Sequence, residues 1–328
     1  MPERPVVDLR SDTVTRPTAA MRRAMAEAEV GDDLLDGDPT VERLQAAFAE
    51  RVGKEAALFV PSGTMGNQLA LRVLAGHGAT VVAGRSQHVV AFEDGAAQEN
   101  TGIDWYLLDD ADGTLHPEEV AAAPGAAVFV EDTHMAAGGR VWPLEQLRAV
   151  GGLVRPVHLD GARVFHAEVA TGVPAADICA PATTVMACLS KGLGAPVGSM
   201  LAGPADVMAE ARRERRRLGG QLRQAGVLAA AGLIALEEGP GRLGEDHARA
   251  TALAEAAAKR WPGALQPGDV ETNIVLVPHD DPDALVAHLA AHGVAARPFG
   301  PGHVRLVTHR DVDDEGIERA VQALLQAP

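Results

Sequence analysis

The sequence predicts an α/β protein: a large domain with a mainly parallel sheet between helices, followed by a smaller C-terminal α+β domain. Short apolar runs that end abruptly in polar residues alternate with helical stretches, a pattern typical of a mainly parallel sheet covered on both faces. The length of 328 residues is enough for about two domains. The pattern changes after residues 237–241, Glu-Glu-Gly-Pro-Gly, which predicts domains 1–238 and 239–328.

The large domain is expected to begin with an extended segment and two helices. Apolar residues recur at helical spacing over 18–29, a loop rich in Asp, Gly and Pro follows over 31–39, and Thr40 is a suitable N-cap for a helix over 40–52. The sheet then begins, with strands and helices in alternation. We expect strands over 57–61, 80–83, 128–131, 157–160 and 184–189, and a helix over 64–74.

The end of the chain predicts a buried helix and then the small domain. Residues 224–236 are nearly all apolar, so a helix there should be buried on every side. The remaining pattern alternates helices and strands, the order of a small α+β unit. We expect helices over 242–261, 283–292 and 313–326, and strands over 273–277 and 304–307.

Composition and charge exclude several classes of protein. Apolar residues make up 47% and charged residues 23%, and the net charge of −16 disfavours nucleic acid and anionic membranes as partners. Two cysteines, Cys179 and Cys188, do not make a disulfide framework, which favours a reducing compartment. No apolar run reaches the ~18 residues of a membrane span, and the N-terminus lacks the plan of a signal peptide. We therefore expect a cytoplasmic protein.

Lysine is rare, and one lysine has an unusual context. Only three of the 29 basic residues are lysines, and arginine does not lose its proton to serve as an amine nucleophile. Lys191 lies between an apolar run and a Gly-rich turn, where burial would make it a usable amine; a lysine that snorkels from a strand end is the alternative. Lys54 and Lys259 are expected at exposed helix ends.

Two other strand ends carry candidate chemistry, because ligands in open α/β sheets collect at the carboxyl ends of strands. The turn containing Ser62, Gly63 and Thr64 opens a helix and could bind phosphate, or it could merely cap the helix. Asp160 ends a buried strand and needs a partner, for which Arg163 is the structural candidate. A metal site is disfavoured because no third ligand falls at metal spacing.

A phosphate turn, a buried acid and a buried lysine, in that order, together predict pyridoxal 5'-phosphate as the cofactor. Lys191 would hold it as a Schiff base, Asp160 would keep its pyridine nitrogen protonated, and the turn would bind its phosphate.

The sequence also resembles the threonine aldolases (the low-specificity L-threonine aldolases), which have the aspartate-aminotransferase-like fold of pyridoxal-phosphate enzymes. The matching segments occur in the same order along nearly the whole chain. They are residues 8–17 (DLRSDTVTRP), 31–33, 38–41, 61–67 (PSGTMGN), 131–134 (EDTH), 160–163 (DGAR), 189–199 (LSKGLGAPVGS), 223–226 and 304–309 (VRLVTH).

The resemblance implies a role for each residue at a matching position. It assigns to Lys191, Asp160 and the phosphate turn the same roles as the residues themselves predict. It also places His88 on the cofactor ring and His134 near the β-hydroxyl of the substrate. Ser11, Arg163 and Arg305 would clamp the substrate carboxylate.

The same resemblance implies an active site shared between subunits. Arg216 and Arg223 would reach the phosphate of the neighbouring subunit, so the working unit would be a homodimer or a homotetramer. The chain departs from the pattern at Leu35, where an aromatic residue is expected, and at Met135, where Asn is usual. Both changes make the substrate wall more apolar and adaptable, which favours bulkier β-substituents and predicts that β-phenylserine is a better substrate than threonine.

The activity implied is cleavage of L-threonine or L-allo-threonine to glycine and acetaldehyde. His88, His134 and a water are all candidates for carrying the hydroxyl proton. A β-eliminating lyase or an amino-acid racemase on the same fold is an alternative, as is a non-catalytic protein that keeps the fold. A dinucleotide-binding protein is disfavoured because no Gly-x-Gly-x-x-Gly turn follows the first strand.

Overall fold

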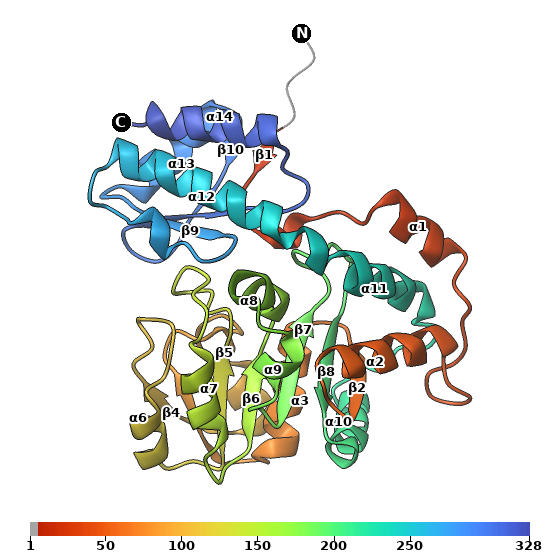
Figure 1. The fold of residues 1–328 in the computed structure, drawn as a ribbon. Helices are drawn as coiled ribbons and strands as arrows, with labels where there is room; N and C mark the ends of the chain where they lie inside the picture. The colour runs from red at the N-terminus through yellow and green to blue at the C-terminus, as the bar shows by residue number, and fades with distance from the viewer. Residues whose placement is uncertain (1–5) are drawn as a thin grey trace.

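A computed structural model describes residues 6–328. Its large part is built on a seven-stranded sheet in which every strand except β8 runs in the same direction (Figure 1). The predicted fold class, a mainly parallel sheet between helices, is therefore confirmed. The strand order is β2 (Ala56–Val60), β8 (Ser199–Gly203), β7 (Thr184–Cys188), β6 (Val157–Asp160), β5 (Ala127–Glu131), β3 (Thr80–Gly84) and β4 (Asp104–Leu108).

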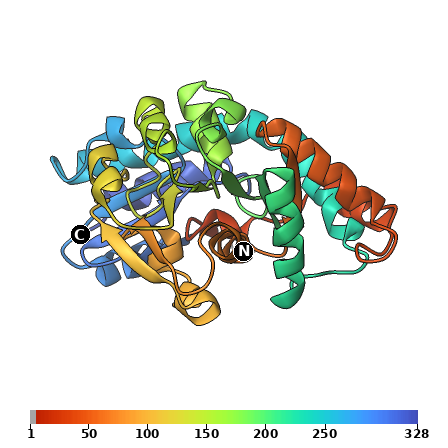
Figure 2. The same ribbon diagram turned by 90° about the horizontal axis from the view of Figure 1, so that it is seen from below.

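Both faces of this sheet are covered because its strands are apolar at successive positions, which point alternately to the two sides. Leu58 and Phe129 face one helix layer, whereas Phe59 and Val128 face the other; Figure 2 shows the layers on opposite sides of the sheet. The first layer contains α3 (Gly63–Leu74), α5 (Ala96–Thr101) and α10 (Ala205–Arg217). The second contains α2 (Pro39–Arg51), α6 (Pro117–Ala122), α7 (Leu144–Gly151), α8 (Val164–Thr171), α9 (Ala175–Cys179) and α11 (Gly226–Glu238).

The C-terminal part is a three-stranded antiparallel sheet with helices on one face. Val304 and Leu306 on the central strand pack under the helices, whereas Val307 packs with Met135 of the large part. Because side chains alternate along a strand, Arg305 lies on the side of Val307. The strands are β11 (Arg297–Pro298), β12 (His303–Val307) and β9 (Ile274–Pro278), and the helices are α12 (Leu243–Arg260), α13 (Pro282–Ala291) and α14 (Asp314–Leu325).

The N-terminal segment joins the two parts. The short strand β1 (Val7–Asp8) pairs in parallel with β10 (Val294–Ala295), and both lie beside α14 in Figure 1. A 3-10 helix (Asp12–Val14) and α1 (Ala19–Ala26) then lead to the large part, where α1 packs on α11. The domain limits 1–238 and 239–328 stay a prediction. Residues 7–8 pair with β10 of the C-terminal part in a separate two-stranded sheet.

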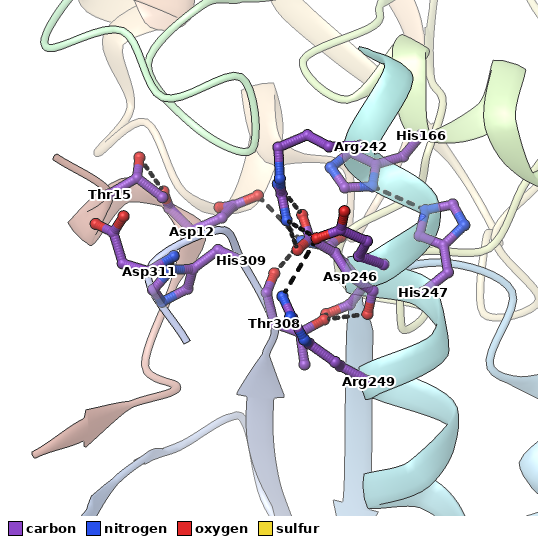
Figure 3. A network of polar contacts seen from close by, with 12 residues as sticks. Asp12, Thr15, His166, Arg242, Asp246, His247, Arg249, Thr308, His309 and Asp311 are labelled. Carbon is purple, nitrogen blue, oxygen red and sulfur yellow. Dashed lines mark hydrogen bonds and ion pairs between the residues drawn. The ribbon is translucent and has the colours of Figure 1, made fainter. Parts of the chain in front are cut away.

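A contact between α8 and α12 joins the large part to the C-terminal part, and contacts of α12 with its own start and with the chain that follows β12 hold the C-terminal part together (Figure 3). Nδ1 of His166 lies 2.9 Å from Nε2 of His247, and the Thr308 hydroxyl donates to the carbonyl of Asp246 at 2.6 Å. Arg242 pairs with the Asp246 carboxylate at 2.5 Å. These contacts place β12, and with it Arg305, opposite the large sheet.

The predicted helices and strands all occur, with ends shifted by at most three residues, and the sequence analysis missed several others. β4 has polar and apolar residues in no regular alternation and lies at the sheet edge, half exposed. The missed helices include α4 (His88–Ala91), which is a single turn. Short 3-10 helices occur at Pro240–Arg242 and Pro267–Asp269. Within residues 6–328, no helix combines the length and apolar character that crossing a bilayer requires.

Candidate active site

A cavity of about 180 Å³ lies at the carboxyl end of the parallel strands and brings most of the predicted cofactor residues together. Asp160 is the last residue of β6, Glu131 is the last residue of β5, and Lys191 follows β7 by three positions. This is the edge at which ligands collect in open α/β sheets. Its wall includes Ser62, Gly63, Thr64, Asn67, His88, Glu131, Asp160, Arg163 and Lys191.

The amino end of α3 opens onto this cavity. The Ser62 hydroxyl caps the helix by accepting from the backbone N–H of Met65 at 3.2 Å. The first N–H groups of a helix lack intrahelical partners, and the helix dipole is positive there. A Cβ at Gly63 would lie 2.9 Å from the Cys188 sulfur, so glycine is needed for α3 to approach β7 this closely. The predicted phosphate turn, called the phosphate cradle below, thus presents free N–H groups and the positive end of a helix dipole on the cavity wall, which suits an anion; its role in binding phosphate stays a prediction.

Asp160 is buried and has no cationic partner among residues 6–328. Its Oδ1 accepts from the backbone N–H of Ala162 at 3.1 Å, and its Oδ2 accepts from the Asn67 amide at 2.8 Å. The alternative that Asp160 pairs with Arg163 is wrong. Arg163 instead makes a two-bond ion pair with Asp12, at 2.7 Å for each bond, because the N-terminal segment places that carboxylate beside it.

Lys191 differs from the other two lysines in its surroundings. Its backbone carbonyl accepts from the Thr15 hydroxyl at 2.9 Å, while its amine has no hydrogen bond or ion pair within the described chain. Lys259 is exposed on α12. The expectation that Lys54 is exposed is wrong: it is half-buried, and its amine donates to the Ala182 carbonyl at 2.5 Å, at the amino end of β7, because the turn after α2 packs there.

His88 and Glu131 form another wall of the cavity. The backbone N–H of His88 donates to Glu131 Oε2 at 2.5 Å, and His88 Nδ1 lies 3.2 Å from Oε1 of the buried Glu93. Burial lowers the pKa of His88, but the hydrogen bond with Glu93 and the charge of Asp160 outweigh it and raise this pKa above its ordinary value.

Arg305 is a buried guanidinium without an anion. It is 5% exposed; its Nη1 lies 3.0 Å from the Met135 sulfur, its Nη2 donates to the Arg10 carbonyl at 3.2 Å, and its Nε has no partner. No carboxylate among residues 6–328 lies within ion-pair distance of it. Burial and neighbouring positive charges lower the pKa of Arg305 to about 10. Such a group is stabilised by an anion supplied from outside the chain.

Ser11 and Arg163 lie on the same side of the site as Arg305. Arg163 is 7% exposed and lines the cavity, and its charge contributes to the lowered pKa of Arg305. Ser11 is half-buried, next to Asp12 in the chain, and accepts from the backbone N–H of Thr13 at 3.3 Å. The three residues predicted to hold a carboxylate therefore belong to one region of the molecule.

The structure does not bring His134 to the cavity wall. Its side chain is fully buried; Nε2 lies 3.0 Å from Asp110 Oδ2, and Nδ1 accepts from the backbone N–H of Ala137 at 3.2 Å. Both ring nitrogens therefore have partners. Its expected place near the substrate hydroxyl stays a prediction that this geometry does not favour.

Leu35, Arg216 and Arg223, which were also predicted to belong to the site, do not line this cavity within one chain. Leu35 is 74% exposed, Arg216 is exposed on α10, and Arg223 is exposed and pairs with Asp32 at 3.4 Å. The sequence analysis did not single out Arg215, which lies on α10 one position before Arg216. Its guanidinium is buried and binds the Asp33 carboxylate and the Phe59 carbonyl.

Sequence reasoning also missed Asn67, Glu93, Glu131 and Asp12. Glu131 ends a buried strand exactly as Asp160 does, so the same strand-end rule could have found it. Asn67 lies one helical turn after the phosphate cradle, a spacing that places it on the same side of α3. Asp12 has no local signal, since its partner Arg163 is distant in sequence, and the bond of Glu93 with Asn67 also joins separate segments.

The described residues fit pyridoxal phosphate. The phosphate cradle, a carboxylate free of cations and an amine without a partner line one cavity. These groups match a phosphate, a protonated pyridine nitrogen and an aldehyde, respectively.

Comparison with known proteins agrees with this fit. The family model for beta-eliminating lyases matches residues 8–280. The low-specificity L-threonine aldolase 1 of Arabidopsis thaliana is 38% identical, over 98% of this chain and 96% of that protein. The low specificity L-threonine aldolase of Escherichia coli K12 is 40% identical, over 94% and 96%. The solved structure of a Leishmania major threonine aldolase superposes with a TM-score of 0.80 at 17% identity, over 97% and 98% of the two chains.

Proposed function

The chain belongs to the beta-eliminating lyase family, and from that premise we propose a pyridoxal 5'-phosphate-dependent aldolase that acts on β-hydroxy-α-amino acids. L-threonine or L-allo-threonine gives glycine and acetaldehyde. The enzyme is a carbon–carbon lyase. When bound, the cofactor supplies an electron sink for the pair released as the Cα–Cβ bond breaks.

The observation that carries this proposal is the buried guanidinium of Arg305 that lacks an anion, on the same side of the site as the free amine of Lys191. An α-amino acid has both an amine and a carboxylate, and a planar guanidinium binds a carboxylate through two hydrogen bonds. Arg163 lies beside it, held in place by Asp12. The two arginines would fix the substrate carboxylate while its amino group lies at the cofactor.

Each cofactor residue has one task. Ser62, Gly63 and Thr64 hold the phosphate at the positive end of α3. Asp160 accepts from the protonated pyridine nitrogen and keeps it charged. Lys191 would supply the amine that holds the cofactor.

His88 is favoured for exchange of the hydroxyl proton, directly or through a water. It lines the cavity, whereas both ring nitrogens of His134 are engaged. A packed apolar region beside Arg305, formed by Met135 with Phe299, is consistent with substrates that carry bulkier β-substituents.

The oligomer is part of the proposal. We infer a cytoplasmic homodimer or homotetramer in which Arg216 and Arg223 of one subunit bind the phosphate of the next. Their exposure, and a groove of about 570 Å³ that Arg216 lines with Leu34, leave them accessible to a second copy.

The test is to incubate the purified protein, loaded with cofactor, with a panel of β-hydroxy-α-amino acids and to identify the products. Equimolar glycine and aldehyde support the proposal. A 2-oxo acid with ammonia would indicate β-elimination, and inversion of the substrate without cleavage would indicate a racemase. A protein that stays colourless when cofactor is added would favour a non-catalytic role.

A further inference from the structure

We propose that Asn67 is a positioning residue, whose side-chain amide sets the orientation of Asp160 and, through Glu93, that of His88. The inference rests on the proposed function, because it assigns Asp160 to the cofactor. It adds to that function a residue that fixes two side chains of the cofactor site, those of Asp160 and His88, relative to each other.

The side-chain amide of Asn67 makes hydrogen bonds with Asp160, Glu93 and His158. Its Nδ2 donates to Asp160 Oδ2 and to Glu93 Oε1, both at 2.8 Å, and its Oδ1 lies 3.0 Å from His158 Nε2. The same Oε1 of Glu93 lies 3.2 Å from His88 Nδ1. Asn67 and Glu93 are both buried, so water does not substitute easily for these bonds.

The neighbours fix which way the amide points. Its nitrogen lies between two carboxylate oxygens, which accept but do not donate. Its oxygen therefore faces His158. Burial lowers the pKa of His158 to about 4, so this ring is neutral at pH 7 and its Nε2 carries the hydrogen that the amide oxygen accepts. His158 Nδ1 then accepts from the Thr184 hydroxyl, at 2.8 Å.

The donors thus form a chain that runs from Thr184 through His158 and Asn67 to Asp160. Each bond polarises the next in the same sense. The Asp160 carboxylate receives one hydrogen on each oxygen, from Asn67 and from the Ala162 N–H, and it keeps free lone pairs toward the cavity. Two bonds from fixed donors hold the plane of the carboxylate and so its direction toward the cavity.

The location of Asn67 explains why the helix is suited to this task. Its first turn carries the phosphate cradle, and Asn67 follows Gly63 by one helical turn. A Cβ at Gly66 would lie 2.6 Å from Met186, so glycine lets α3 lie directly against β7 at this level. One rigid helix therefore sets the distance between the phosphate cradle and the carboxylate at the other end of the cofactor.

The experiment compares Asn67→Leu and the isosteric Asn67→Asp with Gln68→Leu as a matched control. Gln68 is the next residue on α3, is equally buried and donates to Glu93 Oε2 at 3.0 Å, but it does not contact Asp160. For each variant we would measure the thermal midpoint, the dissociation constant of the apoprotein for pyridoxal phosphate, and kcat and KM for L-threonine as a function of pH.

We expect Asn67→Leu to lower kcat by ~10-fold or more, from the loss of its hydrogen bond to the Asp160 carboxylate. The change in KM should be smaller, and cofactor binding should be weaker. In Asn67→Asp the introduced carboxyl has a hydrogen to donate only when protonated. Its activity relative to the unmodified enzyme should therefore rise as the pH falls. Gln68→Leu removes one bond to Glu93 and none to Asp160, so it should lower the thermal midpoint with a smaller loss of kcat than Asn67→Leu and no change in cofactor affinity.

Two results would overturn the proposal. One is that both Asn67 variants keep the kcat and the cofactor affinity of the Gln68 control. The other is that Asn67→Asp loses activity by the same factor at every pH, as a purely structural defect would. If Asn67→Leu does not fold, Asn67→Asp decides alone. If the unmodified protein binds the cofactor but cleaves no threonine, the proposed function fails, while the cofactor affinities still decide the role of Asn67.

Discussion

Replacing Arg305 by lysine removes a planar set of donors while it keeps a positive charge. In the structure the guanidinium is buried beside the Met135 sulfur and the Phe299 ring, and its Nε has no partner among residues 6–328. Its Nη2 donates one hydrogen to the Arg10 carbonyl and has a second. Nε and Nη2 lie on the same edge of the guanidinium, so they can donate the two parallel bonds that a substrate carboxylate accepts. An ammonium in the same place presents a single nitrogen and does not reproduce the fork.

The magnitude follows from the loss of one of two charge-assisted hydrogen bonds. Such a bond is worth about 1.5–3 kcal/mol, which corresponds to about a 10- to 150-fold higher KM for the amino acid. Cofactor affinity should change far less, because Arg305 does not line the cavity that holds the phosphate cradle, Asp160 and Lys191.

The assay measures KM for L-threonine and the dissociation constant for pyridoxal phosphate, in Arg305→Lys and in a control, Arg297→Lys. Arg297 lies opposite Arg305 on the neighbouring strand and is exposed, so its replacement should leave KM unchanged. The reasoning is refuted if Arg305→Lys releases the cofactor while the affinity for the amino acid holds.

Three further predictions follow from other contacts. Asp160→Asn should fold normally and lower kcat by more than ~10-fold, because a neutral amide does not stabilise a protonated pyridine; turnover near that of the unmodified enzyme would make Asp160 structural only. β-Phenylserine should have a higher kcat/KM than threonine, since a phenyl group buries more apolar area, and Leu35→Tyr should narrow this gap if a second subunit brings the exposed Leu35 to the site; an unchanged ratio would count against that placement. Burial raises the pKa of the Asp12 carboxyl, but the charge and hydrogen bonds of Arg163 outweigh the effect of burial. They hold this pKa well below its ordinary value. The pair therefore stabilises the fold above about pH 4 and loses that effect as the pH falls further. Urea unfolding should show Asp12→Asn destabilised by about 3–5 kcal/mol at neutral pH, with a smaller difference in acid, and equal stability at both pH values would contradict the pair.

The parts of the site that sequence could predict are those set by local pattern. Asp160 and the turn at Ser62–Thr64 each follow an apolar strand, and Lys191 is one of three lysines, so strand-end reasoning finds all of them. The fold class follows from the same alternation. None of this required knowledge of which strands are neighbours.

The parts that could not be predicted depend on contacts between distant segments. Asp12 and Arg163 are far apart in sequence and meet only because the N-terminal segment crosses from the C-terminal part to the large part. Arg215 looks like the other arginines of α10, yet it alone among them is buried, since its partners lie on β2 and in the loop before α2. Lys54 was expected to be exposed because the carbonyl that its amine binds, that of Ala182, is distant in sequence.

The measurement that tests the account most directly is to locate the cofactor on the chain. Borohydride reduces the bond between pyridoxal phosphate and a lysine amine, and peptide mapping then identifies the modified lysine. We predict that the label lies on Lys191 and that Lys191→Ala loses both the label and turnover, because the Lys191 amine lines the cavity and has no partner among the described residues. Label on Lys54 or Lys259, or no label on a cofactor-loaded protein, would contradict the central claim.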